Sequence, residues 1–134
     1  MIDLLYRAAD ALRRHREHGG SGALGEDVAH RYLRGRGCIV VARNYQMRSG
    51  SGEIDLVAWH GATLVFVEVK TRSTADFGEP ERAVDEEKQR RLQRAARDYA
   101  RRAGVEWDRT RFDIVSVVVE KPRVSIEWIQ NAFR

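Results

Sequence analysis

The chain has 134 residues, of which 43% are hydrophobic and 33% are charged, a composition typical of one globular domain with a buried core. No apolar run reaches the ~18 residues of a membrane span, so no contact with a membrane is expected. The single cysteine, Cys38, excludes an internal disulfide and predicts a cytoplasmic protein. The net charge of +4 favours a polyanionic partner without requiring one.

Residues 1–20 are predicted to form a helical appendage, because apolar residues recur at helical spacing and a glycine-rich joint follows that would leave the segment mobile. Residues 21–134 are expected to form a single domain. Its first helix should run from Gly22 to about Arg34. On this helix Glu26 could point at the sheet as an acidic ligand or a water-binding group, or it could interact only with the helix dipole.

A hairpin of two apolar strands is predicted within Gly52–Arg72, after an earlier strand from Cys38 to Tyr45. Gly61 and Ala62 suit a two-residue type II′ turn, because glycine takes the first central position, where φ is positive. A different turn or a three-residue loop would change the register and the faces. Apolar residues fill both faces, which is typical of a central strand pair in a sheet that helices cover.

Charged residues gather at the open end of this hairpin. With the expected turn, Asp55 comes opposite Glu68, and Glu53 comes opposite Lys70. Because side chains alternate between faces, Asp55, Glu68 and Lys70 should share one face. The apolar residues expected beyond them on that face are Val57, Leu64 and Phe66. The opposite face should be wholly apolar and carry Ile54, Leu56, Ala58, Val65, Val67 and Val69.

This charge pattern indicates a divalent metal ion that acts on a phosphodiester, because close carboxylates repel one another unless a cation compensates. Asp55 and Glu68 would bind Mg²⁺ or Mn²⁺, with the backbone carbonyl of Val69 as a further candidate. Lys70 would orient or deprotonate the attacking water, or neutralise charge in the transition state. The chain has only three lysines among 24 basic residues, which suggests that arginine would not serve here. The alternative is a functionless ion-pair ladder at a sheet edge, with Glu53 facing Lys70.

A long helix is expected from Pro80 to about Arg102. Lys88 lies on its apolar stripe, so its side chain either extends past the core to solvent or reaches the rim of the site. Two paired strands should close the chain, and the first of them, 111–120, contains Asp113, to which the sequence assigns no role. The order α-β-β-β-α-β-β predicts an α/β fold with a central mixed sheet flanked by helices.

Several short motifs occur together and in order over about residues 21–130. They are G-x-x-G-E at Gly22–Glu26, Asn44-Tyr45, GEIDLVA at Gly52–Ala58, VFVEVKTR at Val65–Arg72, FGEP at Phe77–Pro80, Lys88, Ala95-Ala96 with Tyr99, and RFDIV at Arg111–Val115. This set resembles the YraN-like family of small bacterial proteins, within the restriction-endonuclease-like, or PD-(D/E)xK, nuclease superfamily. The proline that usually precedes the superfamily's aspartate is absent, and Ile54 takes its place.

The resemblance implies a restriction-endonuclease-like fold in which Asp55, Glu68 and Lys70 form the catalytic triad and Glu26 adds an acidic residue from a helix. It implies a Mg²⁺-dependent endonuclease on DNA, including branched or structured DNA, without a small-molecule cofactor. The residues expected to contact nucleic acid are Lys88, Arg72 and Arg91. The superfamily includes members that bind without cutting, so a non-catalytic nucleic-acid-binding module is the alternative. An interaction subunit and a homodimer are also compatible with the sequence.

Overall fold

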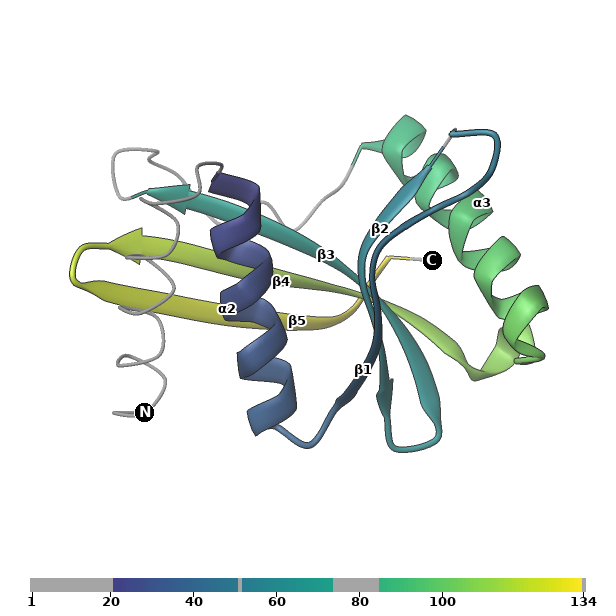
Figure 1. Cartoon of the computed structure of the whole chain (residues 1–134), viewed down its shortest axis with the longest axis horizontal. Coiled ribbons are helices and arrows are strands. Elements are labelled where there is room, and N and C mark those ends of the chain that lie inside the picture. Colours follow the sequence, from purple (N-terminus) through teal and green to yellow (C-terminus); the bar gives the residue numbers. More distant parts are fainter. Residues whose placement is uncertain (1–20, 51, 74–84, 134) are drawn as a thin grey trace.

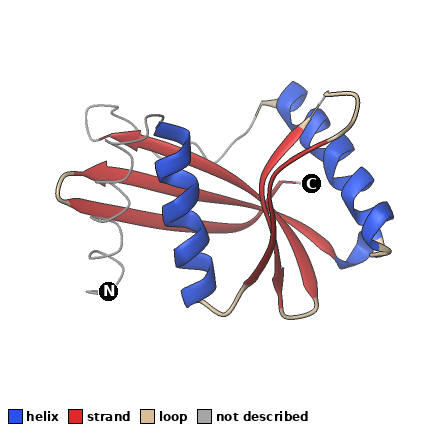
Figure 2. Cartoon of the chain, in the orientation of Figure 1, coloured by secondary structure: helices blue, strands red, loops and turns tan. Residues whose placement is uncertain are grey.

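The computed structural model describes residues 21–50, 52–73 and 85–133, which form two helices, a 3₁₀ turn and five strands (Figure 1; Figure 2). The predicted appendage at 1–20 and the motif at 77–80 lie outside these residues. The elements are α2 (Ser21–Gly35), β1 (Ile39–Gln46), β2 (Glu53–His60), β3 (Thr63–Ser73), α3 (Glu86–Ala103), η1 (Trp107–Arg109), β4 (Thr110–Glu120) and β5 (Arg123–Phe133). Their order confirms the predicted α-β-β-β-α-β-β arrangement.

The strands form one mixed sheet in the order β1-β2-β3-β4-β5. β3 and β4 pair in parallel, and α3 lies between them in the chain, whereas the other neighbours are antiparallel. The predicted mixed α/β sheet is therefore confirmed. β2 and β3 lie inside the sheet, so the charged end of their hairpin does not belong to a sheet edge. The alternative of a functionless ion-pair ladder assumed an edge position.

The turn between β2 and β3 has the predicted geometry. Gly61 has a φ of 61°, while Ala62 has no positive φ, as a type II′ turn requires. His60 pairs with Thr63, and the pairing continues in the same register to Leu56 with Val67. The register that the turn chemistry predicted is confirmed over these pairs.

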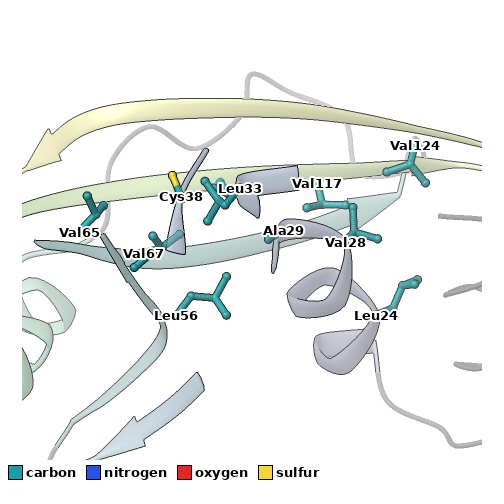
Figure 3. Packing of buried hydrophobic residues seen from close by; sticks show 12 residues of the cluster. Leu24, Val28, Ala29, Leu33, Cys38, Leu56, Val65, Val67, Val117 and Val124 are labelled. Atoms are coloured by element: carbon teal, nitrogen blue, oxygen red, sulfur yellow. The ribbon is translucent and has the colours of Figure 1, made fainter. Parts of the chain in front are cut away.

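Two apolar clusters cover opposite faces of the sheet, because alternate residues of each strand point to opposite sides. On one face, Leu56, Val65 and Val67 pack with side chains of α2, as Figure 3 shows, and Ala58 belongs to the same cluster. The α2 residues in this cluster are Leu24, Val28, Ala29 and Leu33. On the other face, the side chains that pack with α3 are Val57, Leu64, Phe66, Leu92, Ala95 and Ala96. Helices thus cover both faces of the hairpin, as predicted.

Ile54 is the exception to the predicted faces. It packs in the α3 cluster with Val57 rather than in the α2 cluster with Leu56 and Ala58. Backbone pairing of β2 with β3 extends only to Leu56, while Ile54 still pairs with Tyr45 on β1. The strict alternation that the prediction assumed therefore does not continue past the end of the β2–β3 ladder.

Two glycines let the helices approach the strands closely near the charged end of the hairpin. A Cβ atom on Gly25 of α2 would lie 1.7 Å from Oγ1 of Thr71 on β3. A Cβ atom on Gly52 would lie 2.5 Å from the backbone oxygen of Arg91 on α3. A side chain at either position would force its neighbour to move, so the absence of a Cβ at these glycines allows α2 and α3 to lie close to the strands.

Helix α3 begins at Glu86, and the predicted start at Pro80 is wrong. Asp85 has extended backbone angles, φ −62° and ψ 158°, and its Oδ1 accepts a hydrogen bond from the backbone N–H of Lys88 at 2.9 Å. It is therefore the N-cap that satisfies a free N–H of the first turn. Six of the 18 residues of this helix are arginines, and none of the described helices could cross a membrane.

Candidate functional site

The β2–β3 hairpin opens at Asp55. The last backbone pair before it is Leu56 with Val67, and Oδ2 of Asp55 then accepts a hydrogen bond from the backbone N–H of Val69 at 2.8 Å. A strand N–H points toward the neighbouring strand, so the carboxylate takes the place of a backbone carbonyl. The side chain of Asp55 therefore reaches across to β3 between the strands, instead of standing on the α3 face as predicted.

Glu68 has its counter-charge on α3. Its side chain is 7% exposed, and Nζ of Lys88 lies 2.6 Å from its Oε1. Glu68 pairs with Ile114 in the parallel β3–β4 ladder, and Ile114 belongs to the α3 cluster, so both face this helix. Of the two outcomes that the sequence left open for Lys88, the structure shows the one in which it reaches the site.

The carboxylates of Asp55 and Glu68 affect each other electrostatically. The pKa of Asp55 is raised to about 7, mainly by burial, then by the charge of Glu68, with a smaller contribution from the charge of Glu26. The N–H of Val69 and the charge of Lys88 act in the opposite direction. Burial lowers the pKa of Lys88, but its hydrogen bond to Glu68 and the charge of Glu68 outweigh burial, so that pKa is raised. The acidic pair is therefore only partly compensated.

Glu26 of α2 lies near enough to Asp55 for its charge to raise the pKa of Asp55. The first turn of α2 contains no acidic residue, so the interpretation of Glu26 as a helix-dipole residue is wrong. Its side chain is 15% exposed, and Nη2 of Arg43 on β1 lies 3.6 Å from its Oε2. The same guanidinium lies 2.9 Å from Oδ1 of Asp27. Arg43 was not among the predicted residues, and no motif around it indicated this contact.

Lys70 and Arg72 follow Glu68 on the same face of β3. They pair in the parallel ladder with Ser116 and Val118, and both are half-buried. Glu53 does not take the expected place opposite Lys70, because β2 is no longer paired with β3 there. Glu53 instead pairs with Gln46 of β1, whose Nε2 donates a hydrogen bond of 3.5 Å to Oε2 of Glu53.

A basic hollow of about 530 Å³ lies next to the acidic pair, between α3 and the β1–β2 connection. In Figure 1 these two segments run close together, in agreement with the tight approach of Gly52 to α3. We call this hollow the α3 groove, and its basic lining residues are Lys88, Arg91 and Arg94. The other lining residues are Gln46, Gly50, Gly52, Glu53 and Leu92. Arg91 was predicted to contact nucleic acid, whereas Arg94 was not singled out.

The acidic pair suits a hard divalent cation better than zinc. Nowhere in the described residues do three or more His, Cys, Asp or Glu side chains converge as a closed zinc site would require. Mg²⁺ is commonly held by one or two carboxylates, with water and substrate phosphate supplying the other oxygens. Asp55 and Glu68 each use one oxygen in the contacts above. Their arrangement therefore fits Mg²⁺ or Mn²⁺.

The family model described as Uncharacterised protein family UPF0102 matches residues 25–117, more than half of the chain. The chain belongs to this family. The matched range contains every predicted site residue, from Glu26 to Arg91. This membership confirms the resemblance to a family of small bacterial proteins, while the nuclease activity of the wider superfamily stays a prediction.

Similar proteins from bacteria match over nearly their whole lengths. A UPF0102 protein of Solibacter usitatus is 63% identical over 134 residues, which cover 99% of this chain and 100% of the relative. A UPF0102 protein of Koribacter versatilis is 42% identical over 87% of this chain and 81% of its own length. A third, from Rhodococcus jostii, is 46% identical over 84% of this chain and 94% of its own.

Proposed function

We propose that this protein is a divalent-metal-dependent endonuclease that hydrolyses phosphodiester bonds in DNA. The observation that carries the proposal is the partly compensated pair of Asp55 and Glu68, at a point where two central strands separate. A fold gains no stability from two close carboxylates, since their repulsion and desolvation oppose ionisation. A cation-binding role would explain why the fold keeps this unfavourable arrangement. Perturbed pKa values, such as that of Asp55, are common at functional sites.

Asp55 and Glu68 would hold Mg²⁺ or Mn²⁺ through their carboxylate oxygens. The ion would supply positive charge that stabilises the phosphate as negative charge develops on it in the transition state. Lys70, on the same face as Glu68, would orient or deprotonate the attacking water. Glu26 would add negative potential from α2, and the guanidinium of Arg43 beside it would offset part of this potential.

The α3 groove supplies the polyanion contact in this proposal. Lys88 and Arg91 line it, and Arg72 lies beyond Lys70 on the face of β3 that the site shares. Basic side chains in a groove concentrate a phosphate backbone through charge, without reading its sequence. We therefore propose DNA as the substrate class and include branched DNA among the substrates to test.

A non-catalytic nucleic-acid-binding module is the second candidate. The 2.6 Å contact between Lys88 and Glu68 favours it, because the chain's own ammonium already compensates one carboxylate. A binding module of this kind would retain DNA with a steep salt dependence and would release no product when Mg²⁺ is added.

The test compares Asp55→Asn with Glu53→Gln on linear, single-stranded and branched DNA, in Mg²⁺, Mn²⁺ or EDTA. Both changes remove one carboxylate charge from β2, but Glu53 is exposed, lies outside the acidic pair and has Gln46 as its side-chain hydrogen-bond partner. Glu53 lines the α3 groove, and its neutralisation removes no basic phosphate contact there. We expect Asp55→Asn to lower the cleavage rate at least about 100-fold, because the cation loses a ligand and its charge. Glu53→Gln should cleave at nearly the wild-type rate.

Two results would count against the proposal. Equal cleavage by Asp55→Asn and the wild-type protein would show that the site lies elsewhere or that the activity is a contaminant. Salt-sensitive DNA binding by a folded wild-type protein, without any metal-dependent product, would favour the binding module instead.

A further inference from the structure

Lys88 belongs to two neighbouring environments. Its Nζ lies 2.6 Å from Oε1 of Glu68, and its side chain is nevertheless 38% exposed. The same residue lines the α3 groove beside Arg91 and Arg94. Lysine carries its charge on a flexible four-carbon stem, so the ammonium can move between these environments while the backbone of α3 stays in place.

We propose that Lys88 is an exchangeable counter-ion of Glu68. In the metal-free protein it neutralises Glu68, and it turns into the α3 groove when a divalent cation binds Asp55 and Glu68. There its ammonium becomes a phosphate contact for a nucleic-acid strand. This inference rests on the proposed function, since it concerns the same metal site and the same polyanion.

The charge and the burial of Glu68 support the exchange. Glu68 is 7% exposed, and a buried carboxylate without a partner is strongly unfavourable, so it needs a cation in every state. Two cations cannot both compensate the same buried oxygen closely, because like charges a few ångströms apart repel each other. Binding of a divalent ion by Glu68 would therefore weaken the ion pair with Lys88.

The rest of α3 is held in place, which limits the change to the side chain. The Asp85 cap bonds the backbone N–H of Lys88 itself, and Gly52 approaches the backbone of Arg91 closely. Arg91 and Arg94 follow Lys88 at intervals of three residues, and each interval rises about 4.5 Å along a helix. The released ammonium would therefore extend a row of positive charge along the wall of the groove.

The exchange makes cation binding and phosphate binding cooperative. The cation and the phosphate both bind more tightly to the state in which Lys88 has left Glu68. Each ligand therefore increases the affinity for the other by the same factor. Lys88 opposes binding of the metal in the absence of nucleic acid. Once a phosphate in the groove holds the ammonium of Lys88, Glu68 is released and metal binding becomes more favourable.

The decisive measurement is the Mg²⁺ affinity of wild-type protein, Lys88→Met and Arg91→Met by titration calorimetry, without nucleic acid and at pH 8.5. Methionine resembles the lysine stem and removes only the charge. We expect Lys88→Met to bind Mg²⁺ about tenfold more tightly than wild type, or about 1.4 kcal/mol. Arg91→Met, which removes a charge from the same groove wall but not from Glu68, should stay within about twofold of wild type.

A second measurement follows Lys88 directly. The chain has three lysines, so labelling the lysine Cε with ¹³C gives three NMR signals, and Lys88→Met identifies the one from residue 88. Addition of Mg²⁺ should shift this signal toward that of a mobile, solvated lysine, whereas the Lys121 signal should not move.

The outcomes separate this inference from the proposed function. If wild type binds Mg²⁺ but Lys88→Met binds it equally or more weakly, Lys88 is a fixed partner of the site, and the exchange is wrong while the metal site stands. If no folded variant binds Mg²⁺, both the exchange and the metal-dependent function are wrong. Tighter binding by Lys88→Met supports the exchange even if no DNA substrate is cut.

Discussion

Asp113 and Asp55 both lie on interior strands, but their surroundings have opposite characters. Asp113 is 0% exposed and accepts hydrogen bonds at 2.8 and 2.9 Å from Nε and Nη2 of Arg111, at 2.8 Å from Nε1 of Trp128 and at 2.9 Å from the N–H of Asn131. Asp55 accepts one backbone hydrogen bond and lies near Glu68, which raises its pKa. The first carboxylate is saturated by the protein, whereas the second retains capacity for a ligand.

The saturated carboxylate gives Asp113 the role that the sequence could not assign. The β4–β5 ladder is irregular between Phe112 and Ile114, and Asn131 has a positive φ of 53°. Asp113 holds the N–H of Asn131 at this irregularity, while Arg111 also contacts Nδ1 of His60 on β2 at 3.0 Å. This network stabilises the geometry of the sheet, and the end at Asp55 can be left available for chemistry.

The strongest test of the comparison is Asp113→Asn. It removes the charge that compensates Arg111 in a buried position and should lower the free energy of unfolding by about 3–5 kcal/mol. Urea unfolding followed by circular dichroism measures the change, with Asp55→Asn as the control on another interior strand. A loss below about 1 kcal/mol would mean that Asp113 does not anchor the sheet.

The charge of Asp55 should destabilise the folded protein, in contrast to the charge of Asp113, and the pH dependence of stability should show this. Its pKa of about 7 in the folded protein lies above the ordinary value of 3.8, so the folded state binds more protons than the unfolded chain between these pH values. The free energy of unfolding should therefore fall by about 2–4 kcal/mol as the pH rises from 4 to 8 without metal. Asp55→Asn should remove most of this decline.

Denaturant titrations at several pH values, all in EDTA, measure this slope for both proteins. Asp55→Asn should also be the more stable protein at pH 8, since it lacks the cost of an ionised, partly buried carboxylate. An identical slope in the variant would show that Asp55 titrates normally, and the contrast with Asp113 would then disappear.

Gly25→Ala tests whether the close approach of α2 matters at the site end of the sheet. The added Cβ would lie 1.7 Å from Oγ1 of Thr71, so either Thr71 or the helix must shift, at a cost of about 1–3 kcal/mol. Gly35→Ala on the same helix is the control, because its Cβ would meet nothing within 4 Å.

Combining Gly25→Ala with Thr71→Ala removes the clashing oxygen and should recover part of the lost stability. Thermal unfolding of the single and double variants measures the coupling. Strictly additive effects would indicate that the helix does not depend on this contact.

The smallest expected effect concerns the cap of α3, which carries Lys88 to Glu68. Asp85→Ala should lower stability by about 1 kcal/mol, because the N–H of Lys88 loses its acceptor. Asp85→Ser, which keeps an acceptor, should retain most of the stability. Equal losses in the two variants would mean that the side-chain cap contributes little.

Local chemistry made the hairpin predictable. The Gly61-Ala62 turn determined the register, and the alternation of apolar residues then assigned faces to residues from Leu56 to Val67. The predicted faces are wrong for Ile54 and for the side chain of Asp55. Asp55 accepts the hydrogen bond of the Val69 N–H in place of a backbone carbonyl, and the ladder ends at that point. A period of two assumes an unbroken ladder, and the sequence does not show where a side chain interrupts it.

The start of α3 shows a signal that was present but misinterpreted. Pro80 predicts a helix start, but Asp85 followed by two glutamates is also typical of a helix N-terminus. The cap at Asp85 shows where the described helix begins. Both signals are local, so the residue pattern alone does not rank them, whereas the hydrogen bond from the Lys88 N–H to Asp85 does.

The sequence by itself determined the order of elements, the hairpin register and the family, because turn geometry, alternation and motifs are properties of neighbouring residues. It also brought Asp55 and Glu68 to the same end of the hairpin. Only the tertiary structure decided that Lys88 compensates Glu68, that Arg43 pairs with Glu26 and that Asp113 is saturated. The first two contacts join a helix to a strand and depend on how closely each helix crosses the twisted sheet. The contacts of Asp113 with Trp128 and Asn131 depend instead on how β5 pairs with β4.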